Sequence, residues 1–300
     1  MFEGSTYIKA GPLFIIYIGM KFLTSLSRLF SLILIAAMFA GCGAVPLTGR
    51  RQLLLVSDQE VFEAGLTQYK EYVSSAVLSV NKDATAVVKS VGTKMAAAVE
   101  QYLRATGYES ELANFAWEFN LVKDNQVNAF CMPGGKIVVY EGLLSVAQTE
   151  DELAVVLGHE IAHAVAKHSN ERVSQQIMAQ YGTAIIGAAL SQKSTAVQNV
   201  ATSVFGLGTQ VGLMLPYSRK HEYEADYMGV VFMELAGFDS TAAIGFWTKM
   251  ASLTSGSSNS SGATKKADAS DFLSTHPSDA KRISELQKRI PEAKQIARGM

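Results

Sequence analysis

The hydrophobic and polar positions divide the chain into an apolar leader and a longer, mostly helical part. Residues 14–40 are almost all apolar, and Lys21 and Arg28 are the only charged residues among them. In residues 115–122 apolar and polar side chains alternate, which is the period of a half-buried strand. Residues 136–140 are β-branched and predict a second strand. The pattern predicts an α+β fold, mostly helical, with a small antiparallel sheet made by these two segments.

Helices are predicted where capping residues precede a helical pattern. Ser57 with Glu60, and Thr149 with Glu152, match the capping box that begins a helix. Gly237 is placed to end one. The predicted helices begin at residue 57, run over 84–106, from 149 to about 168 and over 218–235, and include a last segment from Pro277 to about Arg289.

The apolar leader allows two interpretations. Its length is sufficient to span a bilayer as an anchor. A start at Met20 instead gives a short cationic region, an apolar region and small residues before Cys42, which is typical of a bacterial lipoprotein signal. We favour the second interpretation, although the usual motif has an aliphatic residue at the position of Phe39. It assigns residues 1–41 to a signal region, with 1–19 upstream of the true start, and a lipid to the Cys42 thiol.

Charge and cysteine content narrow the possible functions. The formal net charge is −1, so no overall field attracts nucleic acid, and no nucleic-acid partner is expected. The chain has two cysteines, and a lipid on Cys42 leaves Cys131 without an intrachain partner, which excludes a disulfide framework. Three of the five histidines fall within ten positions, at 159, 163 and 168. This grouping directs attention to metal ligands.

The strongest motif is H-E-I-A-H at residues 159–163, inside the helix predicted to begin at Thr149. Positions four apart share one face of a helix, so His159 and His163 can together hold one Zn²⁺. Glu160 between them can then act as the general base toward water. The alternative is a chance match in a buried helix, which so few histidines make rare.

A catalytic zinc site takes three protein ligands, so a third must come from elsewhere in the chain. Glu222 and Asp226 lie four apart in the predicted helix 218–235 and share a face. We assign Glu222 as the third ligand and Asp226 as the acceptor that fixes the tautomer of a ligand histidine. Glu224 points roughly opposite, and His221 lies about 100° around the helix from Glu222. The alternative is a solvated acidic helix face.

The remaining histidines have weaker signals. His168 and His221 are expected to be structural or surface residues. His276 follows a loop rich in Ser, Gly, Asn and Lys and lies at the start of a predicted helix, where it can face a cleft. The alternative for His276 is a helix-capping surface residue. His276 or Arg219 could donate a hydrogen bond to the oxyanion that forms during peptide hydrolysis.

Four motifs together resemble the CAAX prenyl protease and HtpX-like family of zinc metalloendopeptidases, and more narrowly its soluble periplasmic lipoproteins. They are N-A-F at 128–130 with P-G-G at 133–135, H-E-I-A-H at 159–163, S-R-K-H-E-Y-E-A-D at 218–226 and T-H-P at 275–277. The resemblance covers nearly the whole mature chain. It implies a gluzincin-type domain that holds one zinc ion.

The resemblance also implies the role of each matching residue. The residues of the zinc site are His159, His163 and Glu222 as ligands, Glu160 as the catalytic base and Asp226 as the supporting carboxylate. The substrate would add as a strand to the edge strand formed by Asn128, Ala129 and Phe130. His276 matches a histidine that gates the metal in some members.

The predicted function is therefore a zinc metalloendopeptidase that hydrolyses unfolded or damaged cell-envelope proteins. The lipid on Cys42 would attach the protein to a membrane with its domain facing the periplasm. We expect this membrane to be the outer membrane. The mature chain has no membrane-spanning helices of the kind that surround the site in prenyl proteases, so prenylated substrates are not expected. Two alternatives stay open: a zinc-stabilised chaperone or assembly factor, and a structural lipoprotein with a coincidental motif.

The expected organisation follows from these assignments. The chain divides into a signal region at 1–41, a lipid-anchored tether at 42–56, the metallopeptidase domain at 57–251, a flexible loop at 252–270 and a helical segment at 271–300 that packs on the domain. Within the domain, the apolar region 172–215 is expected to form buried or site-covering helices.

Overall fold

The computed structural model describes residues 42–191, 195, 199–200, 203–204, 217–255, 269–276 and 280–300. It divides into two units, residues 1–43 and residues 44–300. The predicted signal region or anchor, most of the apolar region 172–215 beyond residue 191, and most of the predicted loop 252–270 lie outside the described residues. No helix among the described residues is both long enough and apolar enough to cross a membrane.

The described part of the chain is mostly helical, which confirms the predicted fold class. The strands are β1 (Cys42–Ala44), β2 (Arg51–Leu53), β3 (Glu118–Val122), β4 (Ala129–Met132) and β5 (Lys136–Tyr140). The helices are α2 (Asp58–Ser75), α3 (Lys82–Ala105), α4 (Glu141–Leu144), α5 (Glu150–Val165), α6 (His168–Ser191), α8 (Arg219–Leu235), α9 (Ala242–Ser255), α10 (Ser270–Thr275) and α11 (Ala280–Gly299), with a 3-10 helix at Glu109–Asn114.

Side-chain caps fix where the site-bearing helices begin. The Thr149 hydroxyl accepts a hydrogen bond from the Glu152 N–H at the start of α5, and Ser218 accepts one from the His221 N–H at the start of α8. These bonds satisfy backbone donors that the first helical turn leaves unpaired. The helix predicted from 149 to 168 is broken in two, because Lys167 adopts a left-handed backbone conformation with φ 55°. His163 and His168 therefore lie on different helices.

The sheet corrects one prediction. Its strand order is β3-β5-β4, and β3 runs parallel to β5, whereas the sequence predicted an antiparallel pair. The missing element was β4, whose four residues are all buried and show no alternation. β4 forms the antiparallel hairpin with β5 through the turn at 133–135. That turn reverses the chain, so β5 returns in the same direction as β3.

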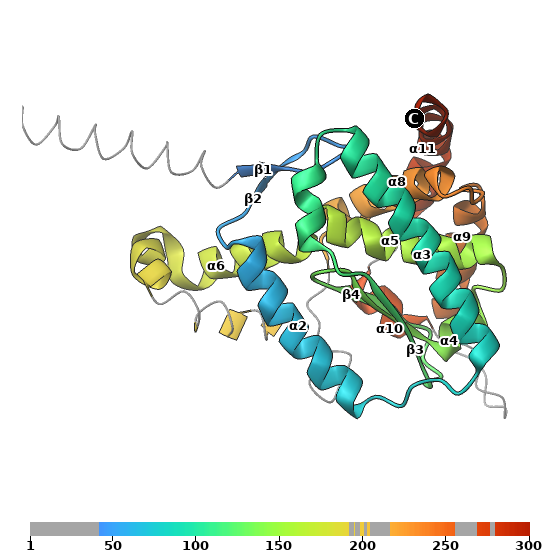
Figure 1. Ribbon diagram of the computed structural model, residues 1–300, viewed down its shortest axis with the longest axis horizontal. Coiled ribbons are helices and arrows are strands. Elements are labelled where there is room, and N and C mark those ends of the chain that lie inside the picture. The colour runs from blue at the N-terminus through green and yellow to red at the C-terminus, as the bar shows by residue number, and fades with distance from the viewer. Residues whose placement is uncertain are drawn as a thin grey trace, which may run out of the picture. The chain divides into compact units, whose positions relative to one another are not determined.

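Helix α5 occupies the centre of the domain, with the sheet on one side of it, as Figure 1 shows. Every residue from Leu153 to His163 is buried. α8 crosses α5 in close contact at two glycines, where a Cβ on Gly229 would lie 3.0 Å from the backbone nitrogen of His159 and from the carbonyl carbon of Gly158. This close approach is what brings the acidic face of α8 to the histidines of α5.

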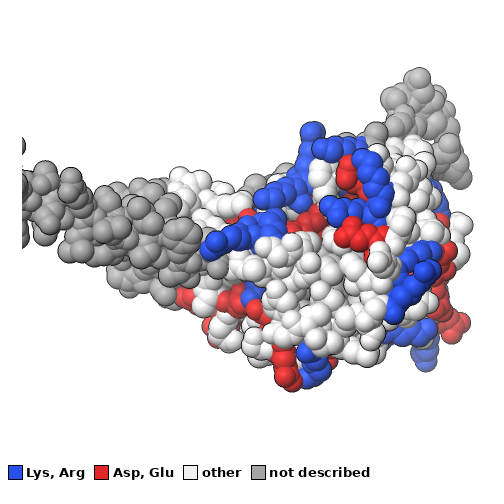
Figure 2. Space-filling view, turned by 90° about the horizontal axis from the view of Figure 1, so that it is seen from above, with Lys and Arg blue, Asp and Glu red and all other residues white. Residues whose placement is uncertain are grey.

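One face of the molecule carries charged side chains of both signs around an uncharged area (Figure 2). On the face shown in Figure 2, basic and acidic side chains lie beside one another. This mixture agrees with the net charge of −1.

Candidate metal centre

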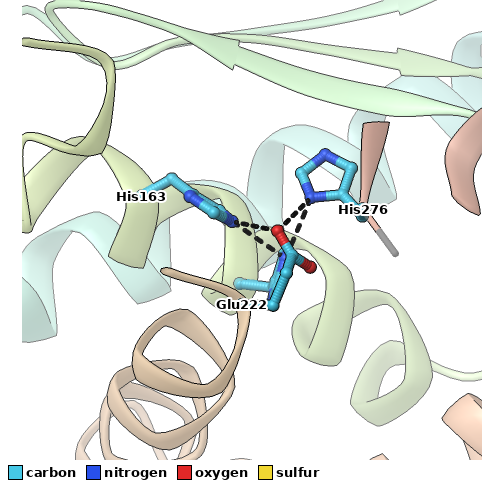
Figure 3. Close-up of side chains that lie close together, drawn as sticks. His163, Glu222 and His276 are labelled. Atoms are coloured by element: carbon cyan, nitrogen blue, oxygen red, sulfur yellow. Dashed lines mark hydrogen bonds and ion pairs between the residues drawn. The ribbon is translucent and has the colours of Figure 1, made fainter. Parts of the chain in front are cut away.

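Four side chains from three parts of the fold converge in the interior. His159 and His163 come from α5, Glu222 comes from the first turn of α8, and His276 follows α10. Each offers a metal-ligating atom, and these atoms all lie within 4.8 Å of one another. Figure 3 shows three of them, His163, Glu222 and His276, pointing toward a common centre. All four side chains are buried.

The imidazole nitrogens at this centre face one another. The Nε2 atoms of His159 and His163 lie 3.0 Å apart, and each lies 3.4 Å from an oxygen of Glu222. His276 Nδ1 lies 3.2 Å from His159 Nε2 and 3.2 Å from the Glu222 carboxylate. Lone pairs that converge in this way need a proton or a metal cation between them.

Electrostatics favour a positive charge at the same centre. Burial alone would lower the pKa of His159, but the carboxylates of Glu222 and Asp226 outweigh it and raise that pKa to about 9. Burial lowers the pKa of His163 well below its ordinary value. In the metal-free protein, one proton between His159 and His163 is therefore favoured, at the position that a metal cation can occupy.

Two buried carboxylate oxygens support the fit to a metal ion. Glu160 Oε1 and Glu222 Oε2 accept no hydrogen bond among the described residues, although Glu222 Oε2 forms an ion pair with Arg282 Nη1 at 3.1 Å. A buried polar atom without a hydrogen bond is costly, and a bound cation would satisfy these oxygens. Two imidazoles and a carboxylate are a donor set that zinc accepts in catalytic sites. The residues present therefore fit a zinc ion.

His159 is oriented by a carboxylate on α8. Its Nδ1 donates to Asp226 Oδ1 at 3.0 Å, which leaves Nε2 free to face the centre. Arg282 on α11 in turn donates two hydrogen bonds of 2.7 Å to Asp226 and lies 3.1 Å from Glu222. Burial would raise the pKa of Asp226, but the Arg282 guanidinium lowers it overall. Sequence reasoning missed Arg282, because no local pattern connects it with α8.

His163 is oriented differently, through a second histidine. His163 Nδ1 lies 2.8 Å from His168 Nδ1, and His168 Nε2 lies 2.9 Å from Glu224. His221 pairs with Glu171 at 3.0 Å, and its ring stacks on that of His168. Both His168 and His221 are buried. The expectation that they are structural holds, and the surface alternative is wrong because each has a buried carboxylate partner.

Glu160 lies beside the centre without a hydrogen bond to its Oε1 atom. That oxygen is 3.4 Å from His276 Nε2. Burial raises the pKa of the Glu160 carboxyl.

His276 is also buried, which excludes the surface alternative, and its ring stacks on Phe272. It caps the C-terminal end of α10, because its N–H bonds to the Phe272 carbonyl, and the predicted helix start at Pro277 lies outside the described residues. Arg219 is exposed on the first turn of α8.

The predicted substrate strand is only partly as expected. β4 is an edge of the sheet, and the Tyr140 N–H bonds to the Asn128 carbonyl. In an antiparallel pair the bonding direction alternates along the strand, so the backbone of Asn128 and Phe130 faces β5. Ala129 and Cys131 therefore direct their backbone groups away from β5. The Cys131 position had no predicted role.

Two further features next to the histidines have no sequence signal. The ring of Tyr217 lies 3.9 Å from that of His163, and the Trp247 ring lies 5.4 Å from that of His159. A cavity of about 40 Å³ lies between β4 and α2, and His163 forms part of its wall. The two rings and the cavity wall therefore border the histidines of the centre.

A pair of histidines one helical turn apart, a glutamate between them and a carboxylate from a second helix define a metallopeptidase domain. The chain belongs to Peptidase family M48, whose model matches residues 88–290.

Three curated proteins illustrate its relatives. The chain is 37% identical over 191 residues to mitochondrial metalloendopeptidase OMA1 of Schizosaccharomyces pombe, covering 61% of this chain and 50% of that protein. It is 28% identical over 277 residues to the protein of the same name from Saccharomyces cerevisiae, covering 87% and 75%. It is 28% identical over 181 residues to the beta-barrel assembly-enhancing protease of Yersinia pestis, covering 59% and 35%. The chain thus spans about half the length of the first of these relatives.

Proposed function

We propose that this protein is a zinc metalloendopeptidase. In this proposal His159, His163 and Glu222 bind the zinc ion, and Glu160 is the general base. The observation that carries it is the convergence of two histidine Nε2 atoms and the Glu222 carboxylate in a buried centre, beside Glu160 Oε1, which accepts no hydrogen bond.

Each side chain of the proposed site has a separate role in peptide hydrolysis. Zinc, when bound, supplies a Lewis acid that activates water and polarises the scissile carbonyl. Glu160 accepts the proton of the attacking water and passes it to the leaving amine. Asp226 holds the ring of His159 in one tautomer. His276 lies 3.2 Å from His159 Nε2 and from the Glu222 carboxylate, so in this proposal it donates to the oxyanion or gates access to the metal.

The substrate is proposed to be an extended peptide. It adds to the outward edge of β4, where the Ala129 and Cys131 backbone groups face away from β5. Such pairing reads the peptide backbone and gives weak sequence selectivity. Unfolded or damaged proteins expose extended backbone, which makes them the proposed substrate class.

We also propose that the protein acts in the bacterial cell envelope as a lipoprotein attached through Cys42, facing the periplasm and most simply at the outer membrane. The signal-like sequence before Cys42 supports this location. The Yersinia pestis relative is named a beta-barrel assembly-enhancing protease, and this name suggests a role in envelope quality control. Replacing Cys42 by Ser should abolish incorporation of labelled palmitate and release the protein from membranes. Unchanged palmitate labelling would contradict the anchor.

The test of the catalytic assignment compares two isosteric substitutions on α5. Glu160→Gln removes the proposed base, whereas Glu150→Gln changes an exposed carboxylate of the same helix. We expect Glu160→Gln to lower the turnover of unfolded casein by at least about 10²-fold, with zinc content unchanged. Glu150→Gln should match the wild type. Turnover by Glu160→Gln at the wild-type rate would contradict the role of Glu160.

A further inference from the structure

The segment that follows Cys42 is packed against the domain, although the sequence predicted only a tether at 42–56. Its turn is tight: the Val45 N–H bonds to the Arg50 carbonyl and the Gly49 N–H to the Val45 carbonyl, both at 2.9 Å. Leu47 and Gly49 adopt left-handed conformations, with φ 72° and 65°. This turn directs the side chains of Thr48 and Arg50 inward, toward α8.

Both side chains hold the same carboxylate. Thr48 Oγ1 donates to Glu224 Oε1 at 2.5 Å, and Arg50 Nε donates to Glu224 Oε2 at 2.6 Å. The guanidinium also makes a two-pronged contact with Glu171, at 2.7 and 3.1 Å. The side chains of Arg50, Glu171 and Glu224 are 13%, 9% and 6% exposed. Little solvent therefore competes with these charge-assisted bonds.

Glu224 determines how His168 can bond. The carboxylate accepts the proton on His168 Nε2 at 2.9 Å. A neutral imidazole with a proton on Nε2 has a bare Nδ1, which can only accept. His168 Nδ1 lies 2.8 Å from His163 Nδ1, so His163 donates there. His163 is thereby left with a bare Nε2, the atom that faces His159 and Glu222.

In both histidines of α5 the Nδ1 atom donates a hydrogen bond outward and Nε2 faces the centre, but the acceptors of the two hydrogen bonds differ. His159 donates directly to the carboxylate of Asp226. His163 reaches a carboxylate only through His168. The position of Glu224 is set in turn by Thr48 and Arg50, two residues from the segment that precedes the predicted domain.

We propose that Thr48 and Arg50 are positioning residues of the metal centre, acting through Glu224 and His168 on His163. This inference rests on the proposed zinc site. In this proposal the segment just after the predicted lipid anchor helps to position a zinc ligand and is not only a spacer. Outer partners of metal-bound histidines commonly change metal affinity by about 10–100-fold when removed.

The test measures zinc affinity of the full chain by competition with a chelator. Arg50→Gln removes both ion pairs, and Arg51→Gln changes its exposed neighbour as the control. We expect Arg50→Gln to raise the zinc dissociation constant about tenfold or more, Arg50→Lys to recover part of the loss, and Arg51→Gln to leave it unchanged. Equal dissociation constants for Arg50→Gln and Arg51→Gln, in folded protein, would overturn the proposal.

Two additional measurements keep the test decisive. Thr48→Val removes one hydrogen bond to Glu224 and little volume, so it carries the test if Arg50→Gln does not fold; a dissociation constant unchanged from wild type would count against the proposal. Nitrogen-15 NMR of histidine side chains in the zinc-free protein should show His168 protonated on Nε2. Protonation on Nδ1 would contradict the relay. Failure of wild-type protein to bind zinc would instead contradict the proposed function, because the His168 tautomer is read without metal.

Discussion

Arg282 is the residue that allows two carboxylates to be buried at one place. Glu222 and Asp226 are almost completely buried, and burying an unpaired carboxylate would cost several kcal/mol. The planar guanidinium binds both oxygens of Asp226 and contacts Glu222. A lysine at this position would keep the charge but lose the two-pronged geometry.

We therefore predict that Arg282→Lys weakens zinc binding by about 10–100-fold. The comparison is Arg289→Lys on the same helix, where the arginine is 49% exposed and pairs with Glu292. Chelator competition and thermal unfolding of both variants measure the effect. If Arg282→Lys binds zinc as tightly as Arg289→Lys does, Arg282 has no part in holding the centre.

Among the residues of the site, the sequence predicted those that lie close together along the chain. His159, Glu160 and His163 were found because helical spacing alone places them together. Glu222 was found because a zinc site requires a third ligand and few acidic helix faces were available. Arg282 and Tyr217 contact the centre from other segments, so no spacing could reveal them.

The crossing of α5 and α8 is the element-scale feature that assembles the centre. Gly158 and Gly229 let the two backbones approach closely, since neither helix has a side chain at the contact. A larger residue at this position would separate the helices. The carboxylate of Glu222 would then move away from the two histidines of α5.

Gly229→Ala should consequently lower the free energy of unfolding by about 1–3 kcal/mol, the usual cost of overpacking, and weaken zinc binding. Gly245→Ala on α9 is the matched control, because a Cβ there meets nothing within 4 Å. We expect that control to stabilise the protein by about 0.5–1 kcal/mol through helix propensity. Urea unfolding and zinc competition give both quantities. A stable Gly229→Ala variant with wild-type affinity would rule out this account of the crossing.

Helix starts were predictable and strand pairing was not. Ser57, Thr149 and Ser218 cap helices within a few residues, so their signals are local. The direction of β3 relative to β5 depends on β4, whose uniformly buried residues carry no alternation. Without that strand, two extended segments joined by one turn are expected to pair antiparallel.

Glu171 connects three parts of the whole molecule. Its carboxylate joins α6 to Arg50 of the N-terminal segment and to His221 of α8. Burial would raise the pKa of Glu171, but the bonds to His221 and Arg50 outweigh it and lower the pKa to about 2. The ordinary value is about 4.3. The charged form is therefore favoured by folding, and its contribution to stability is present above about pH 4.3 and lost as the pH falls toward 2.

We predict that Glu171→Gln destabilises the zinc-free protein most above pH 5, with the gap from wild type narrowing as the pH falls to 3. Glu109→Gln, at a side chain 73% exposed, serves as the control. Urea unfolding at several pH values measures both differences. A gap that stays constant from pH 5 to 3 would argue against the depressed pKa.

The predicted tether is the clearest whole-molecule departure from the sequence interpretation. Its Pro, Gly and Arg residues have the composition of a linker, yet Thr48 and Arg50 are bonded to Glu224. The charge pair of Arg50 and Glu224, separated by more than 170 positions, leaves no trace in a single sequence. Fold class, by contrast, followed from patterns that are repeated along the chain.

X-ray absorption at the zinc edge of the purified protein tests the central claim most directly. The account predicts a single zinc ion per chain, bound only by nitrogen and oxygen at about 2.0–2.2 Å, with scattering from at least two imidazole rings. Absence of stoichiometric zinc, or a zinc–sulfur distance of about 2.3 Å that brings Cys131 into the ligand set, would contradict it.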